Sequence, residues 1–345
     1  MTIREIAELA GVSIGTVDRV IYRRGRVSAE TRDKIEGIIE KYQFTPNPIA
    51  RRLKRNRAYR FYALIPRRYQ DSAYWEQALQ GLEWGADGVR PLGVETEVLE
   101  YDRYNPGEAR NAVNHALAQE PDGMIFAPIV AIKRFIPLVR ERGIPYVFFD
   151  SDFPEMEPLC TISQDPIRGG YLAGRLMHLF AGKITRPVAV LDAHSEDYHI
   201  IRRRDGFLQY AEEYGFATVV KEYSGGGELS EGEITLLFRE NPGLDGIFVT
   251  NSLAHLVAQT VKNIRKTRDV VIIGYDLIPN NRELLQAGAI DALISQRSVN
   301  QGREAVLNLY RHVVLDEKIE PKVEIPLDIY VKENIPPIVP GTGRR

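Results

Sequence analysis

The chain is 345 residues long, 44% hydrophobic and 27% charged, which excludes wholesale disorder, and its length is enough for roughly two domains. No apolar run approaches the roughly 20 residues of a membrane helix, and the charged start from Arg4 onward lacks the apolar stretch of a secretory signal. A single cysteine, Cys160, excludes an internal disulfide framework and a multi-thiolate zinc site, so we expect a cytoplasmic protein without membrane contact.

Charge is distributed unevenly along the chain, although the formal net charge is only −2. Residues 1–60 contain 14 Lys and Arg against 7 Asp and Glu, a net charge of +7. The remaining residues contain 31 basic and 40 acidic side chains, a net charge of −9. A basic head on an acidic body favours a module that binds a polyanion, joined to one that does not. A merely basic surface would give the same count, so the motifs have to decide.

The head begins with the signals of two short helices. Thr2 and Glu5 form a capping box, Ile6 follows at helical spacing, and Gly11 ends the run. Ser13 caps a second helix, and two short helices joined by a glycine-containing turn predict a helix-turn-helix. A third helix is expected to begin at Ser28, its N-cap. Its apolar stripe consists of Ile35, Ile38, Ile39 and Tyr42.

The whole head resembles the lactose-repressor (LacI) family. The resemblance is carried by residues 2–20 (TIREIAELAGVSIGTVDRV), 27–32 (VSAETR) and 46–54 (PNPIARRLK). It implies a small all-α helix-turn-helix DNA-binding domain over residues 1–46, followed by a hinge helix and linker over residues 47–59.

The resemblance also places the DNA contacts. It implies that the helix from Ser13 lies in the major groove, that Ile14 and Gly15 face base edges, and that Arg19 reaches a guanine, whose O6 and N7 accept two parallel hydrogen bonds from arginine. Asp18 departs from the family, where serine is usual; it accepts from a cytosine amine, orients a neighbouring arginine, or only pairs with one at the surface. The expected DNA-binding residues are Thr2, Ser13, Ile14, Gly15, Thr16, Asp18, Arg19, Arg23, Arg24, Asn47, Ala50, Arg51, Leu53 and Arg55.

The hinge is too short to be stable by itself. Asn47 and Pro48 suit an N-cap and a first helical residue, but residues 49–54 alone do not hold a helix in water. In the family this hinge orders on DNA as a pair, and the resemblance implies that Leu53 wedges into the minor groove, which kinks a duplex. An ordinary core role for Leu53 in the linker is the alternative.

The body, residues 60–345, alternates strand and helix patterns. Strand-like runs occur at 61–65, 94–99, 122–126, 145–149, 188–191, 217–220, 245–249, 270–274 and 292–294, with amphipathic stretches between most of them, for example 107–118, 131–142, 165–182 and 252–264. Repeated βαβ units predict an α/β fold with doubly wound parallel sheets, and the length favours two lobes. We expect an N-lobe at about 60–161 and 293–320, and a C-lobe at about 162–292 and 321–340.

Polar side chains follow several of these strands, where ligands bind in open α/β sheets. Two carboxylates, two amides, an arginine and two aromatic rings are candidates: Asp150, Asp276, Asn251, Gln296, Arg203, Tyr74 and Trp75. Carboxylates and amides bridge adjacent sugar hydroxyls, and flat rings cover C–H faces. This set predicts a pocket for a monosaccharide or a polyol.

The body also resembles periplasmic sugar-binding proteins, particularly the ribose-binding type, over nearly its full length. The resemblance implies two lobes that close on a ligand, and Tyr74 and Trp75 replace the paired aromatic residues of that fold. Ser151 stands where the ribose receptor has an arginine, which argues against ribose itself. The expected effector-binding residues are Tyr74, Trp75, Asp150, Ser151, Ser163, His199, Arg203, Asn251, Asp276 and Gln296.

Together these features predict a sequence-specific transcriptional regulator, with double-stranded operator DNA and a small effector as partners. Ligand-released and ligand-recruited DNA binding both fit this prediction. We expect a homodimer, because residues 335–340 carry no heptads for a tetramerising helix.

Two alternatives remain beside this interpretation. One is a sugar-converting enzyme that uses Asp150 and Asp276 as acid and base; the other is a regulator with a purine-like effector. We expect no enzyme, cofactor or metal, because the six histidines show no metal-ligand spacing and no serine lies in a nucleophile elbow.

Overall fold

The computed structural model describes residues 1–21, 25–44, 57–193, 196–223, 229–264 and 270–336. Two compact units form, residues 1–58 with 311–318 and residues 59–310 with 319–345. None of the helices in the described ranges combines the length and apolar character needed to span a bilayer.

The head is helical, as predicted. Its described helices are α1 (Ile3–Ala10), α2 (Ile14–Ile21) and α3 (Ala29–Lys41). The capping box is present, because Thr2 Oγ1 accepts from the Glu5 amide at 3.3 Å and the Glu5 carboxylate accepts from the Thr2 amide at 2.8 Å. Gly11 ends α1 in the left-handed conformation, with φ 69°.

A small apolar core holds the three helices together. It consists of Ile6, Ala7, Ala10, Val17, Val20 and Ile35. Ile38 and Ile39 pack against this core from α3, but Tyr42, expected on the same stripe, is 47% exposed. The reason is local: α3 ends at Lys41, so Tyr42 no longer follows the helical face.

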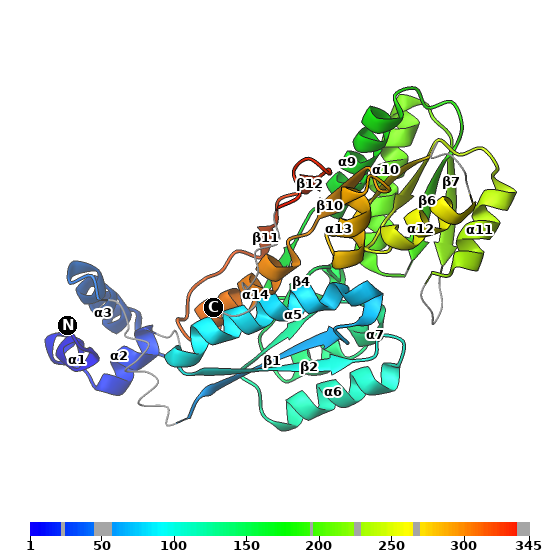
Figure 1. The fold of residues 1–345 in the computed structure, drawn as a ribbon. Helices are drawn as coiled ribbons and strands as arrows, with labels where there is room; N and C mark the ends of the chain where they lie inside the picture. The colour runs from blue at the N-terminus through cyan, green and yellow to red at the C-terminus, as the bar shows by residue number, and fades with distance from the viewer. Residues whose placement is uncertain (22–24, 45–56, 194–195, 224–228, 265–269, 337–345) are drawn as a thin grey trace. The chain divides into compact units, whose positions relative to one another are not determined.

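The first lobe of the body contains a six-stranded sheet in the order β11-β5-β4-β3-β1-β2. Its strands are β1 (Tyr59–Pro66), β2 (Val94–Tyr101), β3 (Gly123–Phe126), β4 (Tyr146–Phe149), β5 (Cys160–Ser163) and β11 (Lys322–Glu324). The connecting elements are α5 (Gln70–Val89), η1 (Arg90–Leu92), α6 (Pro106–Ala118), α7 (Val130–Lys133), α8 (Ile136–Glu141) and η2 (Pro154–Met156). The helices α5 and α6 lie on opposite faces of the sheet (Figure 1).

The second lobe repeats this plan with the order β12-β10-β9-β8-β6-β7. Its strands are β6 (Val188–Ala193), β7 (Thr218–Tyr223), β8 (Gly246–Val249), β9 (Val271–Tyr275), β10 (Ala292–Ser295) and β12 (Asp328–Tyr330). Its helices are α9 (Pro166–Ala181), α10 (Tyr198–Tyr214), α11 (Glu231–Glu240), α12 (Ala254–Ile264) and α13 (Pro279–Gln286). All described strand pairs in both sheets are parallel except β10 with β12, which agrees with the predicted two-lobed α/β fold.

The second sheet is apolar on both faces, which is why its strands read as continuous apolar runs. Val188 and Val190 belong to the core under α9 and α10, whereas Ala189 and Leu191 belong to the core under α11, α12 and α13.

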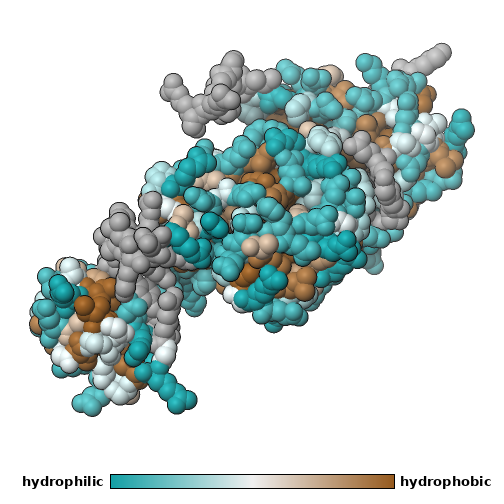
Figure 2. Space-filling view, turned by 90° about the horizontal axis from the view of Figure 1, so that it is seen from below, coloured by the Kyte–Doolittle hydropathy of each residue, from teal (hydrophilic) through white to brown (hydrophobic). Residues whose placement is uncertain are grey.

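On the molecular surface, hydrophilic residues cover most of the face drawn in Figure 2, and hydrophobic residues form separate patches.

The strand pairing corrects the predicted lobe boundaries. The first residues of the segment 293–320, which is expected in the N-lobe, belong instead to the second sheet, because β10 pairs with β9, with Leu293 opposite Gly274. Within the segment 321–340, expected in the C-lobe, β12 does pair with β10 in the second sheet, but β11 pairs with β5 in the first sheet. The helix between them, α14 (Ser298–Val313), packs on α5 in the first lobe, where a Cβ on Gly81 would lie 2.1 Å from the Val299 carbonyl oxygen.

The expected helix at 131–142 is interrupted. The structure has α7 up to Lys133 and a separate α8 from Ile136. Pro137 lies in the first turn of α8, where a missing amide hydrogen is tolerated, and a proline inside one continuous helix would break it.

Candidate functional site

A buried pocket lies between the two lobes of the body, near the carboxyl ends of both sheets. Eight of the ten predicted effector residues line it: Tyr74, Trp75, Asp150, His199, Arg203, Asn251, Asp276 and Gln296. Among the described residues, no three His, Cys, Asp or Glu side chains are arranged to hold a metal ion.

Two aspartates occupy equivalent positions in the two lobes. Asp150 follows β4 and Asp276 follows β9, and both are almost completely buried. Both have positive φ, 74° and 65°, a conformation that costs free energy in residues other than glycine and is found at functional sites. Backbone contacts hold this geometry: the Asp150 amide donates to Ile162 O at 3.0 Å, and the Asp276 amide donates to Ile294 O at 2.8 Å.

Asp150 is only half satisfied by the protein. Its Oδ1 accepts a short hydrogen bond from the Tyr74 hydroxyl, while its buried Oδ2 has no partner. Burial raises the pKa of Asp150 to about 7, although the Tyr74 hydrogen bond and the nearby Arg203 charge oppose the increase. A buried acceptor without a protein partner can accept a hydrogen bond from a bound molecule.

Asp276, Gln296 and Arg203 form a chain of polar contacts on the second lobe. Gln296 Nε2 donates to Asp276 Oδ2 at 2.8 Å, and Gln296 Oε1 accepts from Arg203. Arg203 also donates to the Thr250 carbonyl at 2.8 Å, and its guanidinium lies 3.8 Å from the centre of the Tyr275 ring. Burial raises the pKa of Asp276 to about 6, against the opposing charge of Arg203.

The close packing of α9 and α10 determines where Arg203 lies. A Cβ on Gly170 would lie 1.8 Å from the Arg203 carbonyl oxygen, and one on Gly206 would lie 2.0 Å from the Ile167 carbonyl oxygen. Only glycine permits such a close approach of two helix backbones. These glycines therefore fix the segment that presents Arg203 to the pocket.

Five further residues line the pocket that were not predicted: Asp71, Arg103, Asp197, Ile200 and Ser252. The most informative is Arg103, which donates to Asp71 in its own lobe and to Asp197 Oδ2 in the other lobe at 2.5 Å. Asp197 Oδ1 also accepts from the Val130 amide of the first lobe at 3.2 Å. Burial would lower the pKa of Arg103, but the two carboxylates outweigh it and the pKa is raised.

A sequence signal existed for some of these residues. Arg103 follows the strand at 94–101, and Asp197 follows the strand at 188–193, so both obey the same strand-end rule that identified Asp150 and Asp276. Ser252 comes directly after Asn251. Asp71 lies five residues after β1 and gave no comparable signal.

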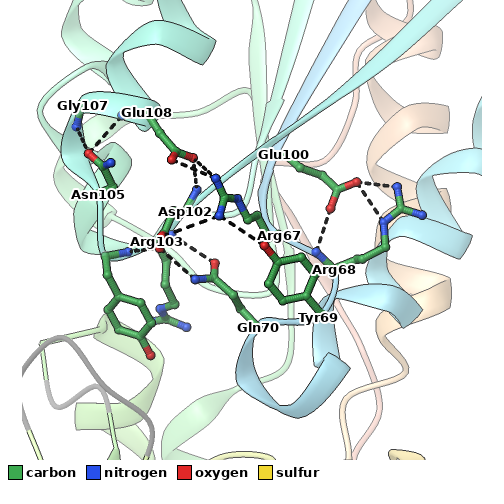
Figure 3. A network of polar contacts seen from close by, with 11 residues as sticks. Arg67, Arg68, Tyr69, Gln70, Glu100, Asp102, Arg103, Asn105, Gly107 and Glu108 are labelled. Carbon is green, nitrogen blue, oxygen red and sulfur yellow. Dashed lines mark hydrogen bonds and ion pairs between the residues drawn. The ribbon is translucent and has the colours of Figure 1, made fainter.

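A polar network positions the loop that carries Arg103 (Figure 3). The Arg103 amide donates to Gln70 Oε1 at 3.1 Å, and Gln70 Nε2 donates to Asp102 Oδ1 at 2.8 Å. Nearby, Arg67 binds both oxygens of Glu108 at 2.8 Å, which joins the loop after β1 to the start of α6. The network thus ties the loops after β1 and β2 together.

The start of α5 is the second contact between the lobes. Asp71, Ser72 and Ala73 have φ of 53°, 58° and 64°, so this segment, which we call the left-handed turn, departs from the helix that follows. The Asp71 carbonyl accepts from Ser252 Oγ of the second lobe at 2.9 Å, and Ser72 Oγ lies 3.3 Å from His255 Nε2 of that lobe.

Two predicted effector residues lie outside the pocket lining. Ser151 is buried behind it, with its Oγ 2.9 Å from His199 Nδ1, so it contacts a lining residue instead. Ser163 lies at the end of β5, where this strand pairs with β11 and Ser163 is opposite Glu324.

The head presents one face of α2 to solvent. Ser13, Ile14, Gly15 and Arg19 are exposed, and Thr16 and Asp18 are partly exposed. Val17 and Val20 are buried on the opposite face, and residues four apart share a face of a helix, so Gly15 lies next to Arg19. Ser13 Oγ accepts from the Thr16 amide at 3.1 Å, which confirms the predicted N-cap. Thr2, at the start of α1, is exposed as well.

The remaining DNA-binding predictions fall outside the described residues. They are Arg23, Arg24, Asn47, Ala50, Arg51, Leu53 and Arg55, which include the hinge.

Family models match both parts of the chain. The model described as bacterial regulatory proteins, lacI family, matches residues 2–47. The model described as periplasmic binding protein domain matches residues 62–317, most of the chain.

Individual proteins agree with these matches. The HTH-type transcriptional regulator DegA of Bacillus subtilis (strain 168) is 28% identical over 352 residues, covering 98% of each protein. A crystal structure of a putative LacI transcriptional regulator from Bacteroides fragilis has a TM-score of 0.72 and 25% identity, covering 81% of this chain and 98% of that one. The glucose-galactose binding protein GanP of Geobacillus stearothermophilus has a TM-score of 0.71 and 22% identity, covering 81% and 99%, which shows a shared fold.

Proposed function

The chain belongs to the lacI family of bacterial regulatory proteins, DNA-binding transcriptional regulators that are not enzymes, and on this premise we propose that its effector is a monosaccharide or polyol bound between the lobes. Binding of this effector controls the affinity of the head for operator DNA. The protein works in the cytoplasm, where its DNA is, and without a cofactor.

The observation that supports a polyhydroxylated effector is the mixture of unsatisfied donors and acceptors in the pocket. Asp150 Oδ2 is a buried acceptor without a partner, and Asn251 Nδ2 and Arg203 Nε are buried donors without partners. A hydroxyl both donates and accepts, so a sugar or polyol satisfies all three groups at once. The Tyr74 and Trp75 rings, 5.1 Å apart at 78°, supply apolar surface for C–H groups.

The proposed control is a two-state equilibrium. A ligand that contacts Asp150 of one lobe and Asp276 of the other binds the closed body more tightly than the open one, so it shifts the population toward closure. In a homodimer, closure changes the distance between the paired hinge segments at 47–59. The hinges then order on DNA or melt, which couples the ligand to the operator.

On DNA, the exposed face of α2 is the proposed reading surface. Arg19 donates to a guanine and Ile14 contacts a thymine methyl in the major groove. Arg24 and Arg55 contact phosphates, and Leu53 wedges into the minor groove.

The test uses the full chain in two steps. Thermal unfolding is measured with a panel of monosaccharides and polyols, because a ligand of the native state raises the transition temperature by mass action. Operator sequences are selected from random duplex DNA, and their affinity is measured with and without the stabilising compound. We expect one compound to raise the transition temperature and change operator affinity at least about tenfold. A panel without any stabilising compound contradicts the proposed effector class.

A further inference from the structure

The side chains that line the pocket carry an excess of negative charge. Four carboxylates, Asp71, Asp150, Asp197 and Asp276, face two guanidinium groups, Arg103 and Arg203, and no lysine is among the lining residues. With neutral histidine and all four carboxylates ionised, the formal charge of the lining is therefore −2. Burial raises the pKa of Asp150 to about 7 and that of Asp276 to about 6, so protons neutralise part of this charge near neutral pH while no cation is bound. Buried charges are normally paired, so this imbalance needs an explanation.

The two arginines do not compensate all four carboxylates. Arg103 is held between Asp71 and Asp197, with its side chain 7% exposed. Arg203 directs its terminal nitrogens to a carbonyl oxygen and to Gln296, not to a carboxylate. Asp276 accepts a hydrogen bond from the side-chain amide of Gln296 and not from an arginine.

Asp150 and Asp276 both lack an ion pair among the described residues, and Asp150 is the one with an unpartnered oxygen. It is 4% exposed, makes no ion pair among the described residues, and bonds through Oδ1 to the neutral Tyr74 hydroxyl. Its Oδ2 has no partner, and the residue lines the pocket. A second unpartnered group, Asn251 Nδ2, lines the same pocket, so the space between them is built for a ligand that brings both a donor and an acceptor.

We propose that the effector carries an amino group whose ammonium form pairs with Asp150, so that it is an aminated sugar or amino polyol. This inference rests on the proposed function and deepens it. The ammonium donates to Asp150 Oδ2 in a charge-assisted hydrogen bond, and the hydroxyls satisfy Asn251 and Arg203. The same charge excess rejects sugar acids and sugar phosphates, which would add negative charge to the pocket.

The test compares matched probes on the full chain. Dissociation constants are measured by isothermal titration for glucose with glucosamine, galactose with galactosamine, mannose with mannosamine, and serinol with glycerol. Glucuronate, galacturonate and glucose 6-phosphate serve as anionic probes. We expect an aminated member to bind about tenfold or more tightly than its neutral counterpart, and the anionic probes to bind more weakly than either.

Two variants identify the group responsible. Asp150→Asn keeps the volume and suits a positive φ, because asparagine tolerates the left-handed region, but it removes the charge. We expect it to abolish most of the preference for the aminated probe while neutral probes lose less. Asp152→Asn is the matched control: it lies two residues away, accepts from Thr161 Oγ1 at 3.2 Å, and does not line the pocket, so the preference should remain.

The outcomes separate this inference from the proposed function. If a neutral sugar binds as tightly as its aminated counterpart, the amino group is wrong and the sugar effector stands. If an aminated probe binds more tightly than its neutral counterpart and Asp150→Asn leaves that difference unchanged, the pairing with Asp150 is overturned. If no polyhydroxylated probe of any charge binds, both proposals fail.

Discussion

The carboxyl groups of Asp150 and Asp276 illustrate how burial and backbone conformation act on single residues. Each follows a parallel strand, each has a left-handed backbone, and each is desolvated enough to raise its pKa. A left-handed aspartate is tolerated better than most residues, since its short polar side chain bonds locally. The combination directs two desolvated acceptors into one pocket from two lobes.

Asp276→Asn tests the second of these acceptors. The change replaces an acceptor oxygen by a donor, which mismatches the Gln296 Nε2 group or a ligand hydroxyl. We expect ligand affinity to fall by about 1.5–3 kcal/mol, roughly ten- to a hundredfold, and ligand-free DNA binding to stay the same. Titration calorimetry and an operator-binding assay measure both. Asp328→Asn, which breaks a surface pair with Arg297, is the control and should leave ligand affinity unchanged.

The raised pKa of Asp150 predicts a pH-dependent stability. Because burial raises this pKa from 3.8 to about 7, the folded state holds a proton between these values that the unfolded chain releases. Its contribution is fully present below pH 3.8 and is lost as the pH rises through 7. The stabilising effect of Asp150→Asn on the ligand-free protein should therefore grow as the pH rises from 3.8 to 7. It should be about 2–3 kcal/mol larger at pH 8 than at pH 5.

Denaturant unfolding of parent and variant at the two pH values measures this difference. Asp192 and Asp276 also have pKa values raised by burial, to about 7 and about 6, so only the difference between parent and variant isolates Asp150. An equal difference at pH 5 and pH 8 would show that Asp150 titrates as an ordinary carboxyl.

Arg19 is the residue on which sequence discrimination by the head should depend. It is exposed on α2 beside Gly15, which adds no side chain between the helix and a base. Arg19→Ala should lose discrimination at one guanine in each half-site, by about 1–3 kcal/mol. Arg24→Ala, at a proposed phosphate contact, should weaken all sequences alike and reduce the salt dependence. Equal losses on operator and random DNA for Arg19→Ala would remove it from base reading.

At the scale of elements, strand ends were predictable and partners across the pocket were not. Strands buried on both faces, such as β8 and β9, read as apolar runs, so the polar residues after them stood out in the sequence. The three-residue strands β11 and β12 carry no such run, and their pairing decides the lobe boundaries. The contact of Arg103 with Asp197 joins residues 94 positions apart and follows only from the closed fold.

The left-handed turn of α5 stores strain that can be measured. Ala73 has φ 64°, where an L side chain costs about 1–2 kcal/mol and glycine does not. Ala73→Gly should therefore stabilise the ligand-free protein by about 1 kcal/mol in denaturant unfolding, after the entropy of glycine in the unfolded chain is subtracted. Ala86→Gly, in the regular part of the same helix, should destabilise by about 1 kcal/mol. Destabilisation of the same size at both sites would argue that Ala73 is unstrained.

At the scale of the whole body, closure depends on a few contacts made across the pocket. Asp197 makes two of them, to Arg103 and to the Val130 amide, from the segment just before α10. Ser252 and His255 make two more, to the left-handed turn. Each of these four contacts is a single polar interaction. The loss of one of them therefore shifts the equilibrium between the open and closed arrangements of the lobes.

Asp197→Asn should therefore favour the open state. The amide keeps an acceptor for Val130 but loses the charge that holds Arg103, which stays paired with Asp71. In solution scattering the ligand-free variant should have a larger radius of gyration than the parent. Its ligand affinity should fall by the factor by which the closed population falls, because only closed molecules bind tightly. The lost hydrogen bond to a charged group contributes about 1.5–3 kcal/mol. The affinity should therefore fall by no more than roughly a hundredfold.

The control lies on α10, the helix that Asp197 directly precedes. Asp205→Asn breaks a half-exposed pair with Arg202 on α10 and touches no contact between the lobes, so scattering and affinity should match the parent. A saturating ligand should return the Asp197→Asn protein to the parent's radius of gyration, since binding selects the closed state in both. If the variant loses affinity while its ligand-free scattering stays that of the parent, Asp197 contacts the ligand but does not hold the lobes together. The control of operator affinity must then depend on the other contacts between the lobes, those made by Ser252, His255 and His199.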